Sequence, residues 1–213
     1  MVCISKIKYL FQISLLIGLV NLGFVTRAQE MKEYYATGEL RAMGYLNADQ
    51  KEGEWKFFYP TGKKNAIENY TEGLLNGTVY YFFPNETLQG KENWIQGVLM
   101  DSAWYYHPNG TLQRKGKYQN SEYIGTWFHF YENGKVERIV NYLMGLPNGK
   151  TLVFNDQGIR IQEGFYQDGL EAGNWKFYSQ TGELEFEGQY AGGQPAGIWY
   201  QFVKGKKKVY KRY

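Results

Sequence analysis

The chain has 213 residues and a formal net charge of +3, and it combines 18% aromatic residues with 26 glycines but only five prolines. This much glycine disfavours a helical protein, because each interior glycine costs a helix roughly 1 kcal/mol relative to alanine. The aromatic content excludes a disordered chain, and the few prolines exclude a collagen-like one. The composition therefore indicates an ordered, β-rich protein with closely spaced turns.

Residues 1–28 have the pattern of a secretory signal peptide. Lys6 and Lys8 precede an apolar stretch at 10–25, and Thr26-Arg27-Ala28 follows it. The stretch is shorter than the roughly 20 residues that a membrane span requires, and it matches the apolar region of an export signal. We therefore expect export to the periplasm or cell surface of a bacterium. Removal of this segment, which holds three basic and no acidic residues, would bring the net charge to zero.

Cys3 is the only cysteine, and it lies within the predicted signal peptide. The mature chain would then have no disulfide, no catalytic thiol and no cysteine-ligated metal.

A period of 24 residues organises the rest of the chain. Glycine recurs at Gly53, Gly77, Gly125, Gly149, Gly173 and Gly197, and Asp101 takes the remaining slot. We number the positions of each repeat from this residue, which is position 0. Position 5 is aromatic in every repeat, at Phe58, Phe82, Tyr106, Phe130, Phe154, Tyr178 and Phe202. Such a period marks units that stack on their neighbours. It predicts about seven repeats over residues 29–203, then a basic C-terminal tail at 204–213, with no second domain.

Each repeat has the pattern of a β-hairpin. Residues 55–59 form an aromatic strand and Pro60-Thr61-Gly62 a loop, which fits a type I turn followed by a left-handed glycine. This loop places position 5 opposite position 11 and position 3 opposite position 13, so that odd positions share one face, which we expect to be the packed one. The predicted fold is all-β, with tandem 24-residue hairpins in one elongated, twisted antiparallel sheet of roughly fourteen strands.

The even positions predict a second face, with aromatic residues on the first strand of each hairpin. The candidate binding residues are Trp55, Tyr59, Tyr81, Tyr105, Trp127, Tyr131, Trp175 and Trp199. Exposed rings at regular spacing stack on sugars, contact peptides or rest on lipid headgroups. The alternative is that these rings fill a second packing face or form cross-strand pairs. The third repeat departs most from the pattern, because Asp101 replaces glycine and Trp104 comes one position late. It marks either a bend or a recognition site.

Catalytic chemistry is not indicated. The two histidines, His107 and His129, occupy positions that are aromatic in other repeats, which favours a structural role. No catalytic residue, metal ligand or cofactor is predicted, and we expect that the protein is not an enzyme. A nucleic-acid partner is not expected for an exported protein, despite the basic tail.

Two motifs resemble a known family. Gly-x-Trp-x-Phe stands within residues 53–62 and 173–182, and Tyr-x-x-Gly follows at 70–73 and 190–193. These segments resemble MORN-repeat variants, the 24-residue type found in bacterial YwqK-family antitoxins, and the resemblance covers residues 34–203. It implies tandem hairpins in a protein- or lipid-binding scaffold without catalytic residues. The antitoxin association implies neutralisation of a toxin by direct binding.

Two functions are consistent with this reasoning. The first is an exported, non-enzymatic scaffold that binds a protein partner through its aromatic face, as an antitoxin or immunity protein would. The alternative is a carbohydrate or cell-wall binding module that uses stacked Trp and Tyr side chains.

Overall fold

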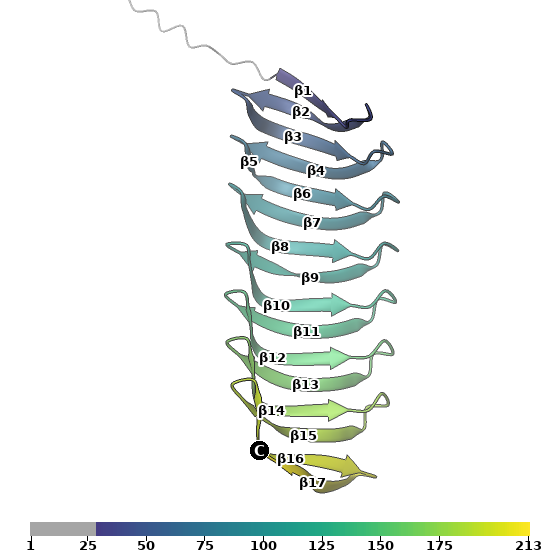
Figure 1. The fold of residues 1–213 in the computed structure, drawn as a ribbon, viewed down its shortest axis with the longest axis vertical. Helices are drawn as coiled ribbons and strands as arrows, with labels where there is room; N and C mark the ends of the chain where they lie inside the picture. Colours follow the sequence, from purple (N-terminus) through teal and green to yellow (C-terminus); the bar gives the residue numbers. More distant parts are fainter. Residues whose placement is uncertain (1–28) are drawn as a thin grey trace, which may run out of the picture.

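The computed structural model describes residues 29–213, and the predicted signal peptide lies outside the described residues. These residues form seventeen antiparallel strands in one open, elongated sheet (Figure 1), which confirms the predicted fold class. The strands are β1 (Gln29–Tyr34), β2 (Leu40–Asn47), β3 (Gln50–Phe58), β4 (Lys64–Thr71), β5 (Leu74–Leu75), β6 (Gly77–Phe82), β7 (Leu88–Ile95), β8 (Val98–Tyr106), β9 (Leu112–Gln119), β10 (Glu122–Phe130), β11 (Val136–Leu143), β12 (Leu146–Phe154), β13 (Arg160–Gln167), β14 (Leu170–Tyr178), β15 (Leu184–Ala191), β16 (Gln194–Val203) and β17 (Lys206–Arg212). No helix long and apolar enough to cross a membrane occurs between residues 29 and 213.

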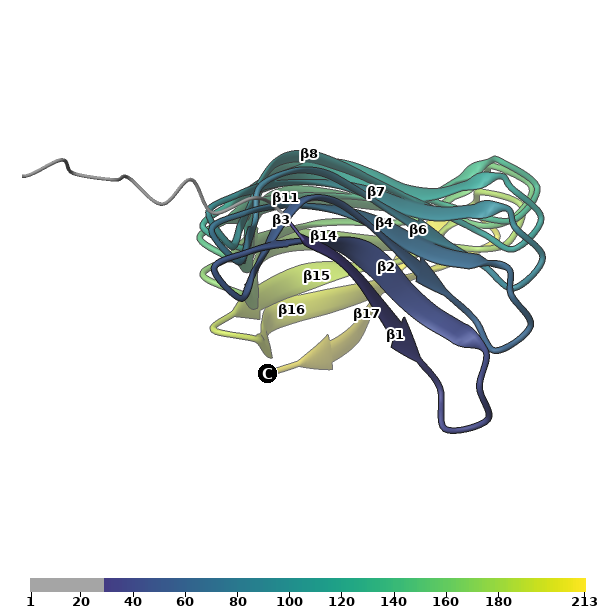
Figure 2. The same cartoon turned by 90° about the horizontal axis from the view of Figure 1, so that it is seen from above.

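Apart from β5 and β6, neighbouring strands of the sheet are consecutive in the chain (Figure 1). The short strand β5 and strand β6 both pair with β4, through Tyr70 opposite Leu75 and Ala66 opposite Tyr81. Seen from one end, the strands bow, so that the sheet has a curved cross-section (Figure 2). Residues 206–212 of the predicted tail are the last strand, which pairs with β16. The lysines of β17 make this edge unfavourable for pairing with another chain.

Two kinds of turn connect the strands. At one edge, the predicted loop is present: the Gly62 amide donates to the Tyr59 carbonyl at 2.8 Å, and Gly62 has a φ of 81°. At the other edge, Glu72 and Gly73 both have positive φ, at 51° and 78°. This is the backbone of a two-residue type I′ turn, whose twist matches the flanking strands.

Asparagine side chains join the loops of successive hairpins. The Nδ2 atoms donate to the next loop, from Asn85 to the Pro108 carbonyl at 2.9 Å, from Asn109 to the Glu132 carbonyl at 3.2 Å and from Asn133 to the Asp156 carbonyl at 2.8 Å. Each of these bonds links two repeats, so the loops stack in the same 24-residue period as the strands.

A β-bulge in each hairpin changes which residues share a face. Phe58 pairs with Lys64, so position 5 lies opposite position 11 as predicted, but Phe57 pairs with Ala66 and leaves Asn65 as an extra residue. Position 13 therefore lies opposite position 4, and the predicted pairing of positions 3 and 13 is wrong. Beyond the bulge, even positions of the first strand share a face with odd positions of the second. The same shift recurs in the later hairpins.

This register defines two faces. We call the face with positions 2, 4, 13, 15 and 17 the tryptophan face, and the face with positions 1, 3, 14 and 16 the opposite face. Position 2 is buried in every repeat, at Trp55, Val79, Ala103, Trp127, Thr151, Trp175 and Trp199. The main core of the sheet therefore lies along the tryptophan face, and the expected packing of the odd positions is wrong for the first strands.

The side chains at position 2 and at position 15 of the preceding repeat have complementary sizes. Tryptophan at position 2 packs on glycine at position 15 of the preceding repeat, in the pairs Trp55 with Gly44, Trp127 with Gly116, Trp175 with Gly164 and Trp199 with Gly188. Where position 15 carries a larger side chain, position 2 is smaller, in the pairs Glu68 with Val79, Glu92 with Ala103 and Val140 with Thr151. A large side chain at one of the two positions is thus accompanied by a smaller one at the other, as close packing requires.

Candidate functional site

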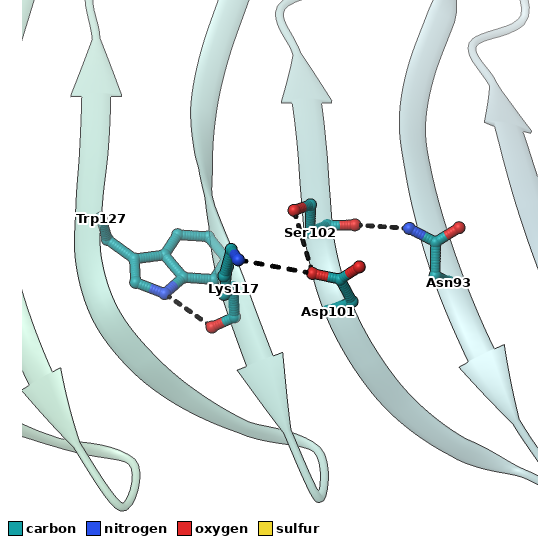
Figure 3. A network of polar contacts seen from close by, with 5 residues as sticks. All are labelled: Asn93, Asp101, Ser102, Lys117 and Trp127. Atoms are coloured by element: carbon teal, nitrogen blue, oxygen red, sulfur yellow. Dashed lines mark hydrogen bonds and ion pairs between the residues drawn. The ribbon is translucent and has the colours of Figure 1, made fainter.

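The four tryptophans that the sequence proposed for binding are enclosed in the core. Their exposed fractions are 0% for Trp55, 1% for Trp127, 1% for Trp175 and 7% for Trp199. Each indole donates from Nε1 to a backbone carbonyl, as Trp127 does to Lys117 at 3.1 Å (Figure 3). A ligand cannot stack on a ring that is covered on both sides. The expectation that these rings form an exposed surface is wrong, because the bulge turns position 2 toward the packed face.

Tyr59 and Tyr131 connect successive hairpins. The Tyr59 hydroxyl donates to the Phe82 carbonyl and the Tyr131 hydroxyl to the Phe154 carbonyl, both at 2.8 Å. His107 stands at the same position of its repeat, and its Nε2 lies 2.9 Å from the Phe130 carbonyl. All three side chains are half-buried. They hold the array together, and His107 takes the place of a tyrosine in this role.

Tyr81 and Tyr105 flank a buried carboxylate. Glu92 is 8% exposed and accepts hydrogen bonds from the Tyr105 hydroxyl at 2.5 Å and the Trp94 Nε1 at 3.0 Å. The Tyr105 hydroxyl also lies 3.1 Å from that of Tyr118. Burial, followed by the hydrogen bond to Glu92, raises the pKa of Tyr105 well above its ordinary value. Glu92 thus replaces the usual glycine at position 15, and its polar atoms are satisfied by the surrounding rings.

Accessible aromatic rings lie on the opposite face instead. Position 3 of three successive repeats carries Tyr80, Trp104 and Phe128, and Lys91 and Lys115 alternate with them on the intervening strands. The cross-strand pairs are Tyr80 with Lys91, Lys91 with Trp104, Trp104 with Lys115 and Lys115 with Phe128. The Nζ of Lys91 lies 5.3 Å from the ring centre of Trp104, and that of Lys115 lies 5.6 Å from the ring centre of Phe128. We call these five residues the aromatic–lysine row.

The row is accessible and extends over five neighbouring strands. Lys115 is exposed and the other four members are half-buried, and residues 29–213 form no second layer above them. Ile139 and Leu152 continue the line of cross-strand pairs on β11 and β12.

The late tryptophan of the third repeat has a simple structural cause. A shift of one residue along a strand turns the side chain to the other face, so Ala103 fills the buried position and Trp104 joins the row. The departure of the third repeat is visible in the sequence, but Tyr80 and Phe128 were not predicted to accompany Trp104. The alternation of rings at position 3 with lysines at position 14 was the signal that could have identified them.

Polar contacts support the third repeat beside the row (Figure 3). Asp101 keeps a positive φ of 60° at the glycine position, and its carboxylate lies 3.8 Å from the Nζ of Lys117. The Ser102 hydroxyl donates to Asp101 at 3.2 Å, and the Ser102 carbonyl accepts from the Nδ2 of Asn93 at 2.8 Å. The strand pairings continue through this repeat, so its departure from the pattern falls within the continuous sheet.

The described residues hold no group of three or more His, Cys, Asp or Glu side chains that could bind a metal ion.

Four segments of the chain match the family model of the MORN repeat variant, at residues 51–72, 105–120, 123–143 and 172–191. Together they cover less than half of the chain. The matched segments coincide with hairpin strands of the sheet, so the chain contains repeats of this type. None of the curated proteins compared with the chain matches it.

Three solved structures show a distant likeness to the chain. The crystal structure of TcdB2-TccC3-TEV matches 83% of this chain and 12% of that chain, with 12% identity and a TM-score of 0.22. The Photorhabdus luminescens Tc holotoxin pore with a mutation in TccC3 matches 84% and 13%, with 12% identity and a TM-score of 0.22. The crystal structure of TcdB2-TccC3 matches 82% and 14%, with 13% identity and a TM-score of 0.19. The protein spans about an eighth of the length of these chains.

Proposed function

We propose that the protein is an exported, non-enzymatic repeat scaffold that binds a protein partner through the aromatic–lysine row. The observation that carries this proposal is the placement of three accessible rings, separated by lysines, in one line across the opposite face. The proposal keeps the predicted use of aromatic side chains for binding. It assigns that role to Tyr80, Trp104 and Phe128 instead of the buried tryptophans.

The row has the properties of a protein-binding surface. Aromatic side chains supply a large contact area with few rotatable bonds, so little conformational entropy is lost on binding. Five neighbouring strands extend the row over roughly 19 Å. Asn93 and Ser102 beside it supply a polar rim. Because Lys91 and Lys115 are the charged members of the row, the partner surface that fits them is apolar with acidic groups.

The antitoxin or immunity role is the more specific form of this proposal. The family resemblance supports it, and the partner would then be a toxin that loses its activity when bound. Export rests on the pattern of residues 1–28, which would place the partner in the periplasm or at the cell surface.

The carbohydrate-binding alternative takes a narrower form in this structure. Stacking on sugars would have to use Trp104 and its neighbours in the row, because Trp55, Trp127, Trp175 and Trp199 are buried. Contact with lipid headgroups would likewise involve the row.

Affinity capture from the cell envelope of the producing organism tests the proposal. A partner should be recovered with the wild-type chain and lost with Trp104→Ala, Phe128→Ala or the double variant Lys91→Glu with Lys115→Glu. Lys63→Glu, in an exposed hairpin loop, is the control for the change of charge and should retain the partner. Equal recovery with the row variants, or no specific partner for the wild type, would contradict the proposal. A peptidoglycan pull-down with the same variants tests the carbohydrate alternative.

A further inference from the structure

Three basic side chains lie side by side in the middle of the tryptophan face. Arg114 on β9 is directly opposite His129 on β10, and His129 is directly opposite Arg138 on β11. Neighbouring strands are about 4.8 Å apart. The two arginines are therefore two strands apart, and their guanidinium groups flank the imidazole of His129.

The two arginines of this cluster differ from other arginines of the described sheet. Arg41 and Arg160 form ion pairs with Glu33 and Glu163. By contrast, neither Arg114 nor Arg138 forms an ion pair with any residue between 29 and 213. The buried Glu92 nearby is already bonded to Tyr105 and Trp94.

The cluster is also short of hydrogen-bond acceptors. Arg114 lies 4.2 Å from the ring centre of Tyr105 and donates from Nη1 to the Tyr123 hydroxyl at 3.3 Å, but its Nε has no partner. The Nε2 of His129 is also buried without a partner. Arg138 is exposed and makes no side-chain hydrogen bond within the described sheet. Packing against Tyr105 explains the position of Arg114, but no contact explains Arg138.

Hollows adjoin the cluster on both sides. Arg114 lines one of about 430 Å³ together with Tyr81 and Tyr105. Arg138 lines another of about 290 Å³ together with Glu137, Tyr142 and Tyr166, and His129 lies between the two hollows without lining either. These volumes are in the range of small-molecule sites, and both hollows combine aromatic rings with a guanidinium group. A ligand could therefore reach each arginine.

We propose that Arg114, His129 and Arg138 form a binding site for an oxyanion, a carboxylate or phosphate group carried by a ligand. Guanidinium groups bind both groups through two parallel hydrogen bonds. A bound oxyanion would neutralise the two guanidinium groups, which form no ion pair within residues 29–213, and would supply an acceptor to the exposed Arg138. This site is separate from the proposed protein-binding row, which lies on the opposite face, so either proposal can fail without the other.

Titration with inorganic phosphate and with citrate tests the site. We expect saturable changes in the imidazole NMR signals of His129, with those of His107 unchanged as the internal control, because the His107 Nε2 is bonded to the Phe130 carbonyl. A response to phosphate alone, to citrate alone or to both identifies the oxyanion and supports the site. No saturable change with either anion would overturn it.

Variants distinguish a binding site from a structural feature. Arg138→Gln should weaken binding of the responding anion at least tenfold, and the free variant should melt no lower than the wild type because the exposed Arg138 forms no ion pair within residues 29–213. Arg160→Gln, which removes an arginine with an ion pair, should bind as the wild type does. Unchanged anion binding by Arg138→Gln would overturn the proposal. A lower melting temperature of the free variant would also overturn it, because it would show that Arg138 is needed for the fold.

Discussion

The indole of Trp127 lies directly over the α-carbon of Gly116, so that a methyl group added to this glycine would fall 2.2 Å from the ring. The same contact joins Trp175 to Gly164 and Trp199 to Gly188. It explains how a single-layered sheet can have a core, because each large ring covers the backbone of the preceding strand. It also explains why these tryptophans are unavailable to a ligand.

Gly116→Ala should therefore be strongly destabilising. The added methyl group requires the buried ring or the strand to move, and overpacking of this kind costs about 1–3 kcal/mol. Urea denaturation measures the loss, with Lys115→Ala on the same strand as the control. A Gly116→Ala variant as stable as the control would show that the ring does not pack on the glycine as described.

The two residues of this contact should show energetic coupling. Gly116→Ala should cost less in a Trp127→Val background than in the wild type, since Glu68 with Val79 shows that a larger residue at position 15 is compatible with valine at position 2. A double-mutant cycle in urea should give an interaction energy of about 1 kcal/mol or more. Additive effects would argue against the complementary sizes of the side chains at positions 2 and 15.

The bond from Tyr59 to the next hairpin should contribute to stability. Tyr59→Phe removes the hydroxyl that donates to the Phe82 carbonyl, and loss of such a bond costs about 1 kcal/mol. Tyr34→Phe is the matched control, because Tyr34 is exposed at 58% on the first strand. If both variants unfold at the same urea concentration as the wild type, the Tyr59 bond does not stabilise the array.

His129 should make stability depend on pH. Burial, together with the charges of Arg138 and Arg114, lowers its pKa to about 4 in the folded chain. The unfolded chain, with the ordinary pKa of about 6.5, then binds the proton first as the pH falls. The contribution of the neutral imidazole is fully present above the ordinary pKa and is lost as the pH falls through the folded value.

The comparison of wild type with His129→Phe isolates this effect. Above pH 7 the difference in unfolding free energy should be constant, and between about pH 6.5 and pH 4 the wild type should lose more stability than the variant. Parallel curves over this range would contradict the lowered pKa.

The sequence was sufficient for the repeats, the hairpin loops and the pairing of Phe58 with Lys64. It was not sufficient for the face on which each ring lies, because a bulge adds one unpaired residue, such as Asn65, without any distinctive residue type. Beyond that residue, the side chains of the second strand lie on the face opposite to the one predicted. The prediction therefore took the buried aromatic residues to be accessible and missed the accessible ones. The period of 24 identifies equivalent positions, whereas the faces of those positions depend on backbone geometry.

The central claim is that a protein partner contacts the opposite face at the aromatic–lysine row. Site-specific photo-cross-linking measures this directly, with an aromatic photoreactive amino acid in place of Trp104 or, as the control on the tryptophan face, in place of the exposed Arg138. The account predicts a cross-linked protein adduct from position 104 and none from position 138. An adduct from position 138 with none from position 104 would contradict it.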